Sequence, residues 1–414
     1  MFLITTILLY RERALFSGKM LAEILLFLLL GIGAGTFTGL FPGIHINLIG
    51  SLIVSASSSF LFFVPAIYLV VFITAMAITH TFLDFIPSVF LGCPDEDTVL
   101  SVLPGHELLK QGKGHAAVIL SAYGGLAAVI LIVVLAFPLV LIVKNVYPIL
   151  QAAIPYILIV VSLLMVFSER KKFPALLVYA LTGVLGLIIL NLQGLSDPLL
   201  PLLTGLFGAS GLVLAIKTKT KVPKQDTEEE KTAMKKPLSG SLMASSLCGF
   251  LPGLGSGQAA ILGNMISKTD RRGFIVLLGA TNTLVMGFSF ISLYTILKTR
   301  TGAAAAIKEV IGTPTAAVLV VILAVVLLSG IASFFLVRKL SLFFSGKINK
   351  VDYSRLSMVT VFVLALVVLL VSGFFGLFVF VISSLAGVYC IQLGVRRTQM
   401  MACLILPTII LYLL

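Results

Sequence analysis

Apolar runs recur along almost the whole chain, and each is close to the length, about 20 residues, that a helix needs to cross the hydrocarbon core of a bilayer. Short polar gaps separate these runs. The 414 residues are 59% hydrophobic and only 11% charged, whereas a soluble domain carries about 25% charged residues. The sequence therefore predicts an integral membrane protein.

No stretch shows the alternation of apolar and polar residues that a transmembrane β-strand requires, so we predict an all-α polytopic protein. We expect about 10–12 transmembrane helices in two repeats that contain broken or re-entrant segments. The apolar segments of the first half lie near residues 20–40, 46–62, 64–80, 115–142, 146–167, 173–191 and 197–216. Those of the second half lie near residues 239–267 (interrupted), 273–297, 313–337, 357–373, 376–394 and 398–414.

The net charge is +13, from 29 Lys and Arg against 16 Asp and Glu. These basic residues lie in the gaps between apolar runs, so we assign them to cytoplasmic loops of a multi-pass cell-membrane protein and expect no nucleic-acid partner. Residues 168–172 are expected to be cytoplasmic, and the turn 191–198, which has no Lys or Arg, to be outside. The four cysteines form no CxxC pair, so we predict neither a metal site nor a disulfide.

Residues 217–237 form the one long polar stretch and divide the chain near its middle. We therefore predict a first transmembrane repeat over 1–216, a charged cytoplasmic linker over 217–237 and a second transmembrane repeat over 238–414. We interpret the linker as a solvated connection, with a regulatory site as the alternative.

Two short motifs suggest that the halves are duplicated. GLFPG begins at Gly39 and GFLPG begins at Gly249, so the copies are 249 − 39 = 210 residues apart. Further along each half, THTFL (79–83) resembles TNTLV (281–285). Because duplicated transporters often place their halves in opposite membrane orientations, we predict an inverted repeat.

The Pro-Gly pair in each copy breaks a helix, because proline lacks an N–H and clashes with the preceding turn while glycine adds backbone freedom. Inside a membrane the freed polar groups must be buried in protein or line a wet cavity. A helix N-terminus there offers N–H groups and partial positive charge to a carboxylate or phosphate. The predicted substrate site comprises Pro42, Gly43, Ile44, His45 and Asn47 of the first copy and Pro252, Gly253, Gly255, Ser256, Gly257 and Gln258 of the second. The alternative is a kinked helix whose small residues allow close packing.

His80 and Asp84 are four residues apart and so share one helix face. An ionisable pair inside an apolar run usually marks function, and histidine changes charge near neutral pH. We therefore take both as candidates for coupling to a proton. Asn282, in the second half, is a candidate oxygen ligand for a cation such as Na⁺. No other cofactor and no catalytic residue are predicted, and no GxxxxGK[ST] motif for a nucleotide occurs.

Four stretches resemble one known family, the large membrane subunit of tripartite tricarboxylate transporters (TctA-type), and in particular its archaeal members. GLFPGIHINLIG (39–50) and GFLPGLGSGQAAIL (249–262) look like that family's two Pro-Gly signatures, and FLGCPDEDTVLSVLPGHELLKQGKGHAA (90–117) and GATNTLVMGFSFI (279–291) are similar to two further segments. The chain departs from the family at two turns: it has Pro94-Asp95 where the family has Pro-Gly, and residues 295–306 contain no proline.

The resemblance implies a cation-coupled permease for organic di- and tricarboxylates such as citrate, which is a symporter and not an enzyme. It also implies a small membrane subunit and an extracytoplasmic solute-binding protein as partners, beside the membrane lipid. A homodimer is one assembly that the sequence allows.

Two other functions compete with this prediction. A translocase for a lipid-linked phosphate such as polyprenyl phosphate could use the same helix ends, but neither Pro-Gly stretch contains Arg or Lys. An intramembrane enzyme is disfavoured, because HELLK (106–110) is not HExxH and all four histidines precede GASG (208–211), whereas a rhomboid-type protease has its histidine after its serine.

Overall fold

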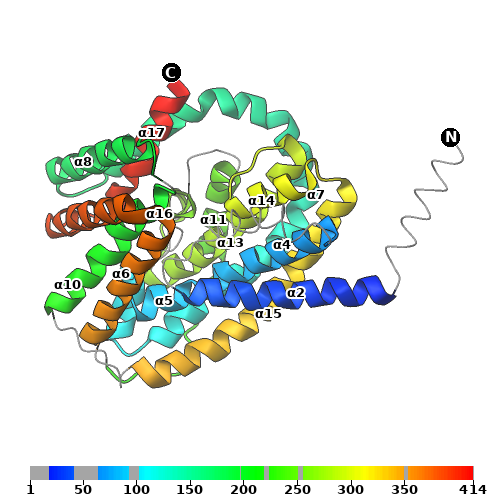
Figure 1. Cartoon of the computed structure of the whole chain (residues 1–414), viewed down its shortest axis with the longest axis horizontal. Helices are drawn as coiled ribbons and strands as arrows, with labels where there is room; N and C mark the ends of the chain where they lie inside the picture. The colour runs from blue at the N-terminus through cyan, green and yellow to red at the C-terminus, as the bar shows by residue number, and fades with distance from the viewer. Residues whose placement is uncertain are drawn as a thin grey trace, which may run out of the picture.

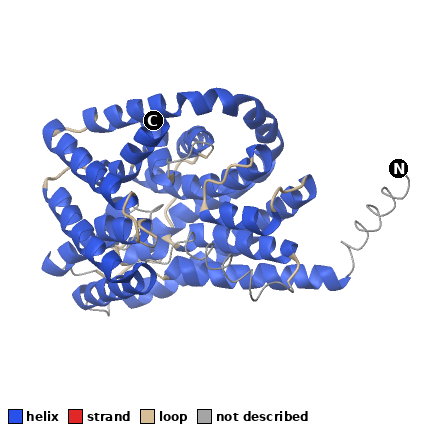
Figure 2. Cartoon of the chain, turned by 45° about the horizontal axis from the view of Figure 1, so that its top comes forward, coloured by secondary structure: helices blue, strands red, loops and turns tan. Residues whose placement is uncertain are grey.

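The computed structural model describes residues 18–41, 64–92, 102–195, 197–218, 223–249, 255–348 and 353–413. Within these ranges the chain forms helices and connecting turns and contains no strand, so the all-α prediction is confirmed (Figures 1 and 2). In the described part of the chain, 7 helices are long and apolar enough to cross a membrane. Shorter apolar helices lie at Pro155–Phe167, Leu199–Leu214 and Gln399–Leu413.

The elements of the first half are α2 Gly18–Leu40, α4 Ala66–Leu83, α5 Phe85–Phe90, α6 Val102–Lys110, α7 Gly114–Phe167, α8 Lys172–Leu190, α9 Leu199–Leu203, the π-helix η2 Thr204–Ala209 and α10 Ser210–Thr218. Those of the second half are α11 Lys235–Cys248, α12 Ser256–Ser267, α13 Arg271–Ile296, α14 Gly302–Ile311, α15 Ala316–Ile348, α16 Tyr353–Gln392, the 3-10 helix η3 Arg397–Met401 and α17 Ala402–Leu413.

Three segments test the predicted boundaries. The interrupted span at 239–267 is indeed two helices, since α11 ends at Cys248 and α12 begins at Ser256. Within α16, Gly373 has φ 68° and ψ −169°, which breaks the helix between the predicted spans 357–373 and 376–394. By contrast, 115–142 and 146–167 belong to the single helix α7, which bends so that its last part arches towards α8 in Figure 1.

Helices α4 and α13 occupy the centre of the molecule (Figure 1). In the span formed by α4 and α5, 83% of the most apolar window is buried, and in α13 the share is 94%, against 17–44% in the other long spans. A helix that is apolar on all sides belongs in the interior, surrounded by other helices. The spans with lower burial, such as α2 and α16, therefore form the outer layer.

Contacts along neighbouring helices give the direction of each central helix. Helix α7 runs parallel to α13, because a Cβ added to Gly279 would lie 2.0 Å from Ser121 O and one added to Gly287 would lie 2.3 Å from Ile132 Cδ1. Helix α15 is antiparallel to α7, since Ser341 Oγ bonds His115 Nδ1 at 3.0 Å near the start of α7 while Gly330 meets Val129 further along.

Helix α4 runs parallel to α15 in turn. Ser333 Oγ donates to Thr79 Oγ1 at 3.0 Å, and Val325, two turns earlier, shares an apolar cluster with Val71 and Ala75. Because α15 is antiparallel to α7 and α7 is parallel to α13, α4 and α13 run in opposite directions through the centre.

The loops with the clearest charge difference lie at opposite ends of α8. Arg396 Nε pairs with Glu169 Oε1 at 2.8 Å, so residues 168–172 and the basic segment before η3 meet at one end. At the other end, Ser372 Oγ donates to Asp197 O at 3.3 Å, so the turn without Lys or Arg lies beside the break of α16 at Gly373.

Candidate functional site

Near the first predicted motif, the structure describes the chain only as far as Phe41. Pro42, Gly43, Ile44, His45 and Asn47 lie outside the described residues, as do Pro252 and Gly253. The structure describes α2, which leads towards the first motif, and α11 and α12, which flank the second.

The end of α2 packs closely on α4. A Cβ added to Gly35 would lie 2.4 Å from Met76 O, and one added to Gly39 would lie 2.7 Å from Leu83 Cβ. Between these two glycines, Thr38 Oγ1 lies 3.1 Å from Nδ1 of the buried His80. Thr38 Oγ1 also donates to Gly35 O at 3.2 Å, so its remaining role towards His80 is that of acceptor. This arrangement places a proton on His80 Nδ1.

Asp84 lies at an interruption between α4 and α5. Pro87 has no N–H to donate to Leu83 O four residues earlier, so the helical hydrogen-bond ladder breaks at this level. Asp84 Oδ2 accepts a hydrogen bond of 2.8 Å from Asn282 Nδ2 of α13, and the same amide lies 3.4 Å from Thr81 O. Thr81 Oγ1 lies 3.2 Å from Thr283 Oγ1. Two of the three coupling candidates, Asp84 and Asn282, therefore meet between α4 and α13, while His80 lies one turn before Asp84 and contacts α2.

We call these groups the polar centre; its members are Thr38, Thr79, His80, Thr81, Asp84, Asn282, Thr283 and Ser333. Each of these side chains is at most 4% exposed. Buried polar groups in an apolar helix bundle are costly unless they bond to one another, and such groups in a membrane usually mark a functional pathway. The polar centre contains residues of both halves, so it holds α4 and α13 together at their crossing.

The second predicted motif repeats the packing of the first. Gly249, at the end of α11, packs on α13: an added Cβ would lie 2.9 Å from Phe288 Cβ, and Gly249 O accepts from Ser292 Oγ at 3.3 Å. Pro237, at the start of α11, lies against Gly273 at the start of α13, so these two helices are parallel. Helices α2 and α4 are also parallel, because Glu23 bonds Tyr68 and Thr38 contacts His80.

The chain after the second break is described from Gly255. Ser256 begins α12 and is buried, and Gly257 and Gln258 lie in its first turn. A Cβ added to Gly257 would meet only Met401 Cε of η3, at 3.7 Å. A Cβ added to Gly240 would lie 2.5 Å from Gly263 O, so α12 runs back along α11. The N-terminus of α12 therefore lies in the interior, beside the end of α11.

The N-terminus of α14 also lies inside the molecule. After α13 the chain turns at Leu297, whose φ is 55°, and returns so that Thr301 N donates to Ser289 Oγ at 3.2 Å. Thr301 Oγ1 then caps α14 by accepting from Ala304 N at 3.3 Å. Arg300 precedes this cap and is near enough to Cys248 of α11 to interact with it electrostatically. The sequence analysis did not single out Arg300, because nothing in the sequence around 295–306 shows that the chain turns back into the bundle.

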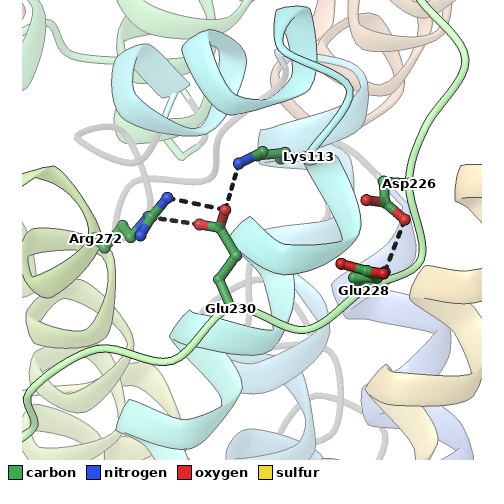
Figure 3. A network of polar contacts seen from close by, with 5 residues as sticks. All are labelled: Lys113, Asp226, Glu228, Glu230 and Arg272. Carbon is green, nitrogen blue, oxygen red and sulfur yellow. Dashed lines mark hydrogen bonds and ion pairs between the residues drawn. The ribbon is translucent and has the colours of Figure 1, made fainter.

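The polar linker is partly docked, which differs from the solvated connection that the sequence suggested. Its residues 223–234, which we call the strap, lie across the start of α7 and α13 in an extended conformation (Figure 3). Gln225 is 7% exposed; its Oε1 accepts from Gly114 N at 2.8 Å and its Nε2 donates to Leu109 O at 3.0 Å. Asp226 N donates to Gly112 O at 2.6 Å.

Two glutamates of the strap join the first half to the second. Glu230 pairs with Lys113 Nζ at 2.6 Å and with Arg272 Nε at 2.5 Å, as Figure 3 shows. Glu229 pairs with Arg338 Nε at 2.7 Å and accepts from Tyr123 OH at 3.0 Å. The acidic residues of the linker thus meet basic residues at the helix ends, a match that hydropathy and local charge do not reveal.

The molecule combines interrupted apolar helices, helix ends inside the bundle and a buried polar centre. Together these features are typical of a polytopic membrane protein of the transporter class. The model of the Tripartite tricarboxylate transporter TctA family matches residues 25–402, so the chain belongs to this family. It is accordingly a component of a transporter and not an enzyme. An uncharacterized protein of Methanocaldococcus jannaschii is 31% identical over 403 residues, which cover 94% of this chain and 99% of that protein. No solved structure matches the chain.

Proposed function

We propose that this chain is a cation-coupled permease for an organic di- or tricarboxylate such as citrate, and that the anion binds at the paired Pro-Gly breaks. The polar centre is the observation that carries this proposal. It lies between α4 and α13 and includes Thr38 near the end of α2, four residues before Pro42 in the sequence. The family to which the chain belongs is named for tricarboxylate transport, which supports the substrate class.

The helix ends supply groups for the anion. The N-termini of α12 and α14 lie inside the bundle, and N–H groups at helix N-termini together with the helix dipole stabilise a bound carboxylate. We expect Gly255, Ser256 and Gly257 to present backbone and hydroxyl groups to one end of the substrate. Pro42, Gly43, Ile44, His45, Asn47, Pro252, Gly253 and Gln258 complete the proposed site.

The polar centre supplies groups for the coupling ion. Asp84 and Asn282 provide hard oxygen ligands of the kind that Na⁺ prefers. If the ion is a proton, His80 Nε2 is the nitrogen that gains and loses it, because Nδ1 already donates to Thr38. Exchange of the ion would change the Asp84–Asn282 contact and thereby the way in which the two halves meet.

We also propose that the two halves are inverted repeats over 1–216 and 238–414, joined by a cytoplasmic linker. The opposite directions of α4 and α13 support this proposal, as do the parallel pairs α2–α4 and α11–α13. Labelling of single cysteines placed in the two Pro-Gly loops tests it. We expect the loops to be reached from opposite sides of the membrane, and labelling of both from one side would overturn the inversion.

The partners proposed are the small membrane subunit and the solute-binding protein of a tripartite system, within the cell membrane. A homodimer of this chain remains a proposal as well. The alternative function, translocation of a lipid-linked phosphate, finds no support in the family to which the chain belongs.

Uptake of labelled citrate into proteoliposomes tests the function, with an inward Na⁺ gradient, an inward proton gradient or neither. We expect accumulation with one gradient only, because coupling to an ion drives uphill transport. Binding of citrate to the detergent-solubilised chain, measured as a rise in melting temperature, tests the site without partner subunits. Absence of both binding and uptake would overturn the proposal.

A further inference from the structure

Two neighbouring arginines at the basic end of the bundle have different surroundings. Arg396 pairs with Glu169 and also donates from Nη2 to Ser168 O at 2.7 Å, with a side chain that is 54% exposed. Arg397 begins η3 and turns inward, against the bare backbone of Gly211 in α10. A Cβ added to Gly211 would lie 3.2 Å from Arg397 Nη1. Because Gly211 has no side chain, the guanidinium of Arg397 can occupy this space.

Arg397 is half-buried and has no ion-pair partner among the described residues. Its Nη1 is fully buried without a hydrogen-bond partner, and no hydrogen bond or ion pair joins the side chain to any described part of the chain. The carboxylates next to Arg396 and next to His106 are engaged with other arginines: Glu169 with Arg396, and Glu107 with Arg271 at 2.7 Å. Burial of a cation without a partner is costly, so this arrangement is stable only if something compensates it.

One titratable group that interacts with Arg397 is also a base, His106. Burial and the positive charges of Arg397 and Lys110 lower the pKa of His106 in α6 to about 4, so this imidazole is neutral at physiological pH. Gln399, two residues further along η3, donates to Met165 O at 2.7 Å, while its buried Oε1 has no partner. The region thus offers donors and positive charge, while Glu169 and Glu107 are paired with other arginines.

Helix η3 links this region to the proposed substrate site. Met401, at its end, is the neighbour of Gly257 in the first turn of α12. Arg397 and the first turn of α12 therefore lie at the two ends of one short helix. A recess beside Arg397, lined by Val178, Cys390 and Met400, is too narrow in this conformation to hold a ligand. Binding would require η3 and α10 to move apart.

We propose that Arg397 binds a carboxylate group of the transported anion as a second station, at the end of the bundle where the basic loops gather. This inference rests on the proposed function, since it takes the same substrate from the Pro-Gly breaks. The planar guanidinium can bond both oxygens of one carboxylate, which gives a match that a lysine ammonium does not. The anion supplies the missing counter-charge, and its departure leaves the guanidinium without a partner, which favours release.

The test compares Arg397→Gln, Arg397→Lys and the matched control Arg396→Gln in the full chain. Citrate affinity is measured from the rise in melting temperature with citrate concentration, and inorganic phosphate serves as the second probe. We expect Arg397→Gln to weaken citrate binding by about 10–100-fold, the range for a lost hydrogen bond to a charged group. The citrate affinity of Arg397→Lys is expected to lie between those of the wild type and Arg397→Gln. Arg396→Gln is expected to bind citrate as the wild type does.

The melting temperature without ligand separates binding from a structural role. Because Arg397 loses no partner on replacement, Arg397→Gln is expected to melt at or above the wild-type temperature. A lower melting temperature with unchanged citrate affinity would show that the arginine only fills space. Binding of phosphate but not citrate by the wild type would also overturn the proposal.

Measurements of uptake and of binding distinguish failure of the second station from failure of the proposed function. Normal uptake by both the wild type and Arg397→Gln would overturn the second station and leave the proposed function intact. Citrate binding that depends on Arg397, with no uptake under any gradient, would overturn the proposed function and leave the second station.

Discussion

The polar centre and the strap both join the two halves of the chain, but they do so in different surroundings. In the polar centre, Asp84 and Asn282 are each 2% exposed and lie between apolar helices. In the strap, the bases that pair with Glu230 and Glu229 are Lys113, Arg272 and Arg338, with side chains 38%, 42% and 50% exposed. A carboxylate of one half therefore bonds an amide of the other half in the interior, whereas the carboxylates of the strap pair with partly exposed bases.

This difference determines what each contact is expected to do. An exposed ion pair contributes about 0–1 kcal/mol, because water and salt screen it. A buried polar contact has few alternatives, so removal of one partner leaves the other unsatisfied and costs more. We conclude that the polar centre controls how the halves meet, whereas the strap adds a small stabilisation at the ends of the helices.

The largest effect is expected from Asp84→Ala. The change removes the acceptor of Asn282 Nδ2 and leaves that amide buried without it, at a cost of about 1.5–3 kcal/mol. We expect a lower melting temperature and loss of citrate uptake. Asp84→Asn is the control, since it keeps the size and removes the charge; it should fold and still fail to couple uptake to an ion. Normal coupled uptake by both variants would exclude Asp84 from the mechanism.

A double-mutant cycle compares the two regions directly. The coupling energy between Asp84→Ala and Asn282→Ala is expected to reach about 1–3 kcal/mol, as for buried partners in one network. That between Glu230→Gln and Arg272→Gln should stay within about 0.2–1 kcal/mol. Both are measured as changes in the free energy of unfolding. Equal coupling in the two cycles would remove the distinction between interior and surface.

A smaller effect is expected from Glu230→Gln alone. The variant loses the pairs with Lys113 and Arg272, so its melting temperature should fall slightly at low salt and match the wild type at high salt. Glu228→Gln is the control, because Glu228 is an exposed residue of the strap that takes part in none of these ion pairs. A loss that persists at high salt would show that the strap contributes more than screened charge.

The last effect is expected only at acidic pH and concerns His106 of α6. Its pKa is lowered to about 4, from an ordinary 6.5. In this pH range the unfolded chain binds the proton before the folded chain does, so stability is full above about 6.5 and falls as the pH drops towards 4. His106→Gln should reduce this loss, as seen in melting temperatures from pH 4 to 8. An identical pH profile for both proteins would contradict the lowered pKa.

Local signals in the sequence were enough for some elements. The run lengths predicted an all-α membrane protein, and the Pro-Gly pair at 252–253 predicted the separation of α11 from α12. The His80–Asp84 pair and Asn282 stood out as polar residues in apolar runs, and the structure brings Asp84 and Asn282 together. These signals succeed because a charge or a proline in an apolar run is costly wherever it lies.

Other features depend on contacts between distant segments and could not be predicted from local patterns. The strap looked like a solvated linker because its composition is polar, yet its glutamates meet bases more than 40 residues away, such as Arg272. Arg397 looked like one more basic loop residue beside Arg396. Only the fold shows that one of the two arginines is paired at the surface while the other turns inward.

The most direct test of the central claim is citrate uptake by Gly43→Leu and Gly253→Leu, with Gly33→Leu as the matched control. No described atom lies within 4 Å of a Cβ added to Gly33, so the control should fold and transport normally. If the Pro-Gly breaks bind the anion, both loop variants will reach the membrane and lose uptake. If both transport citrate as the wild type does, the breaks only pack helices together and the proposed site is wrong.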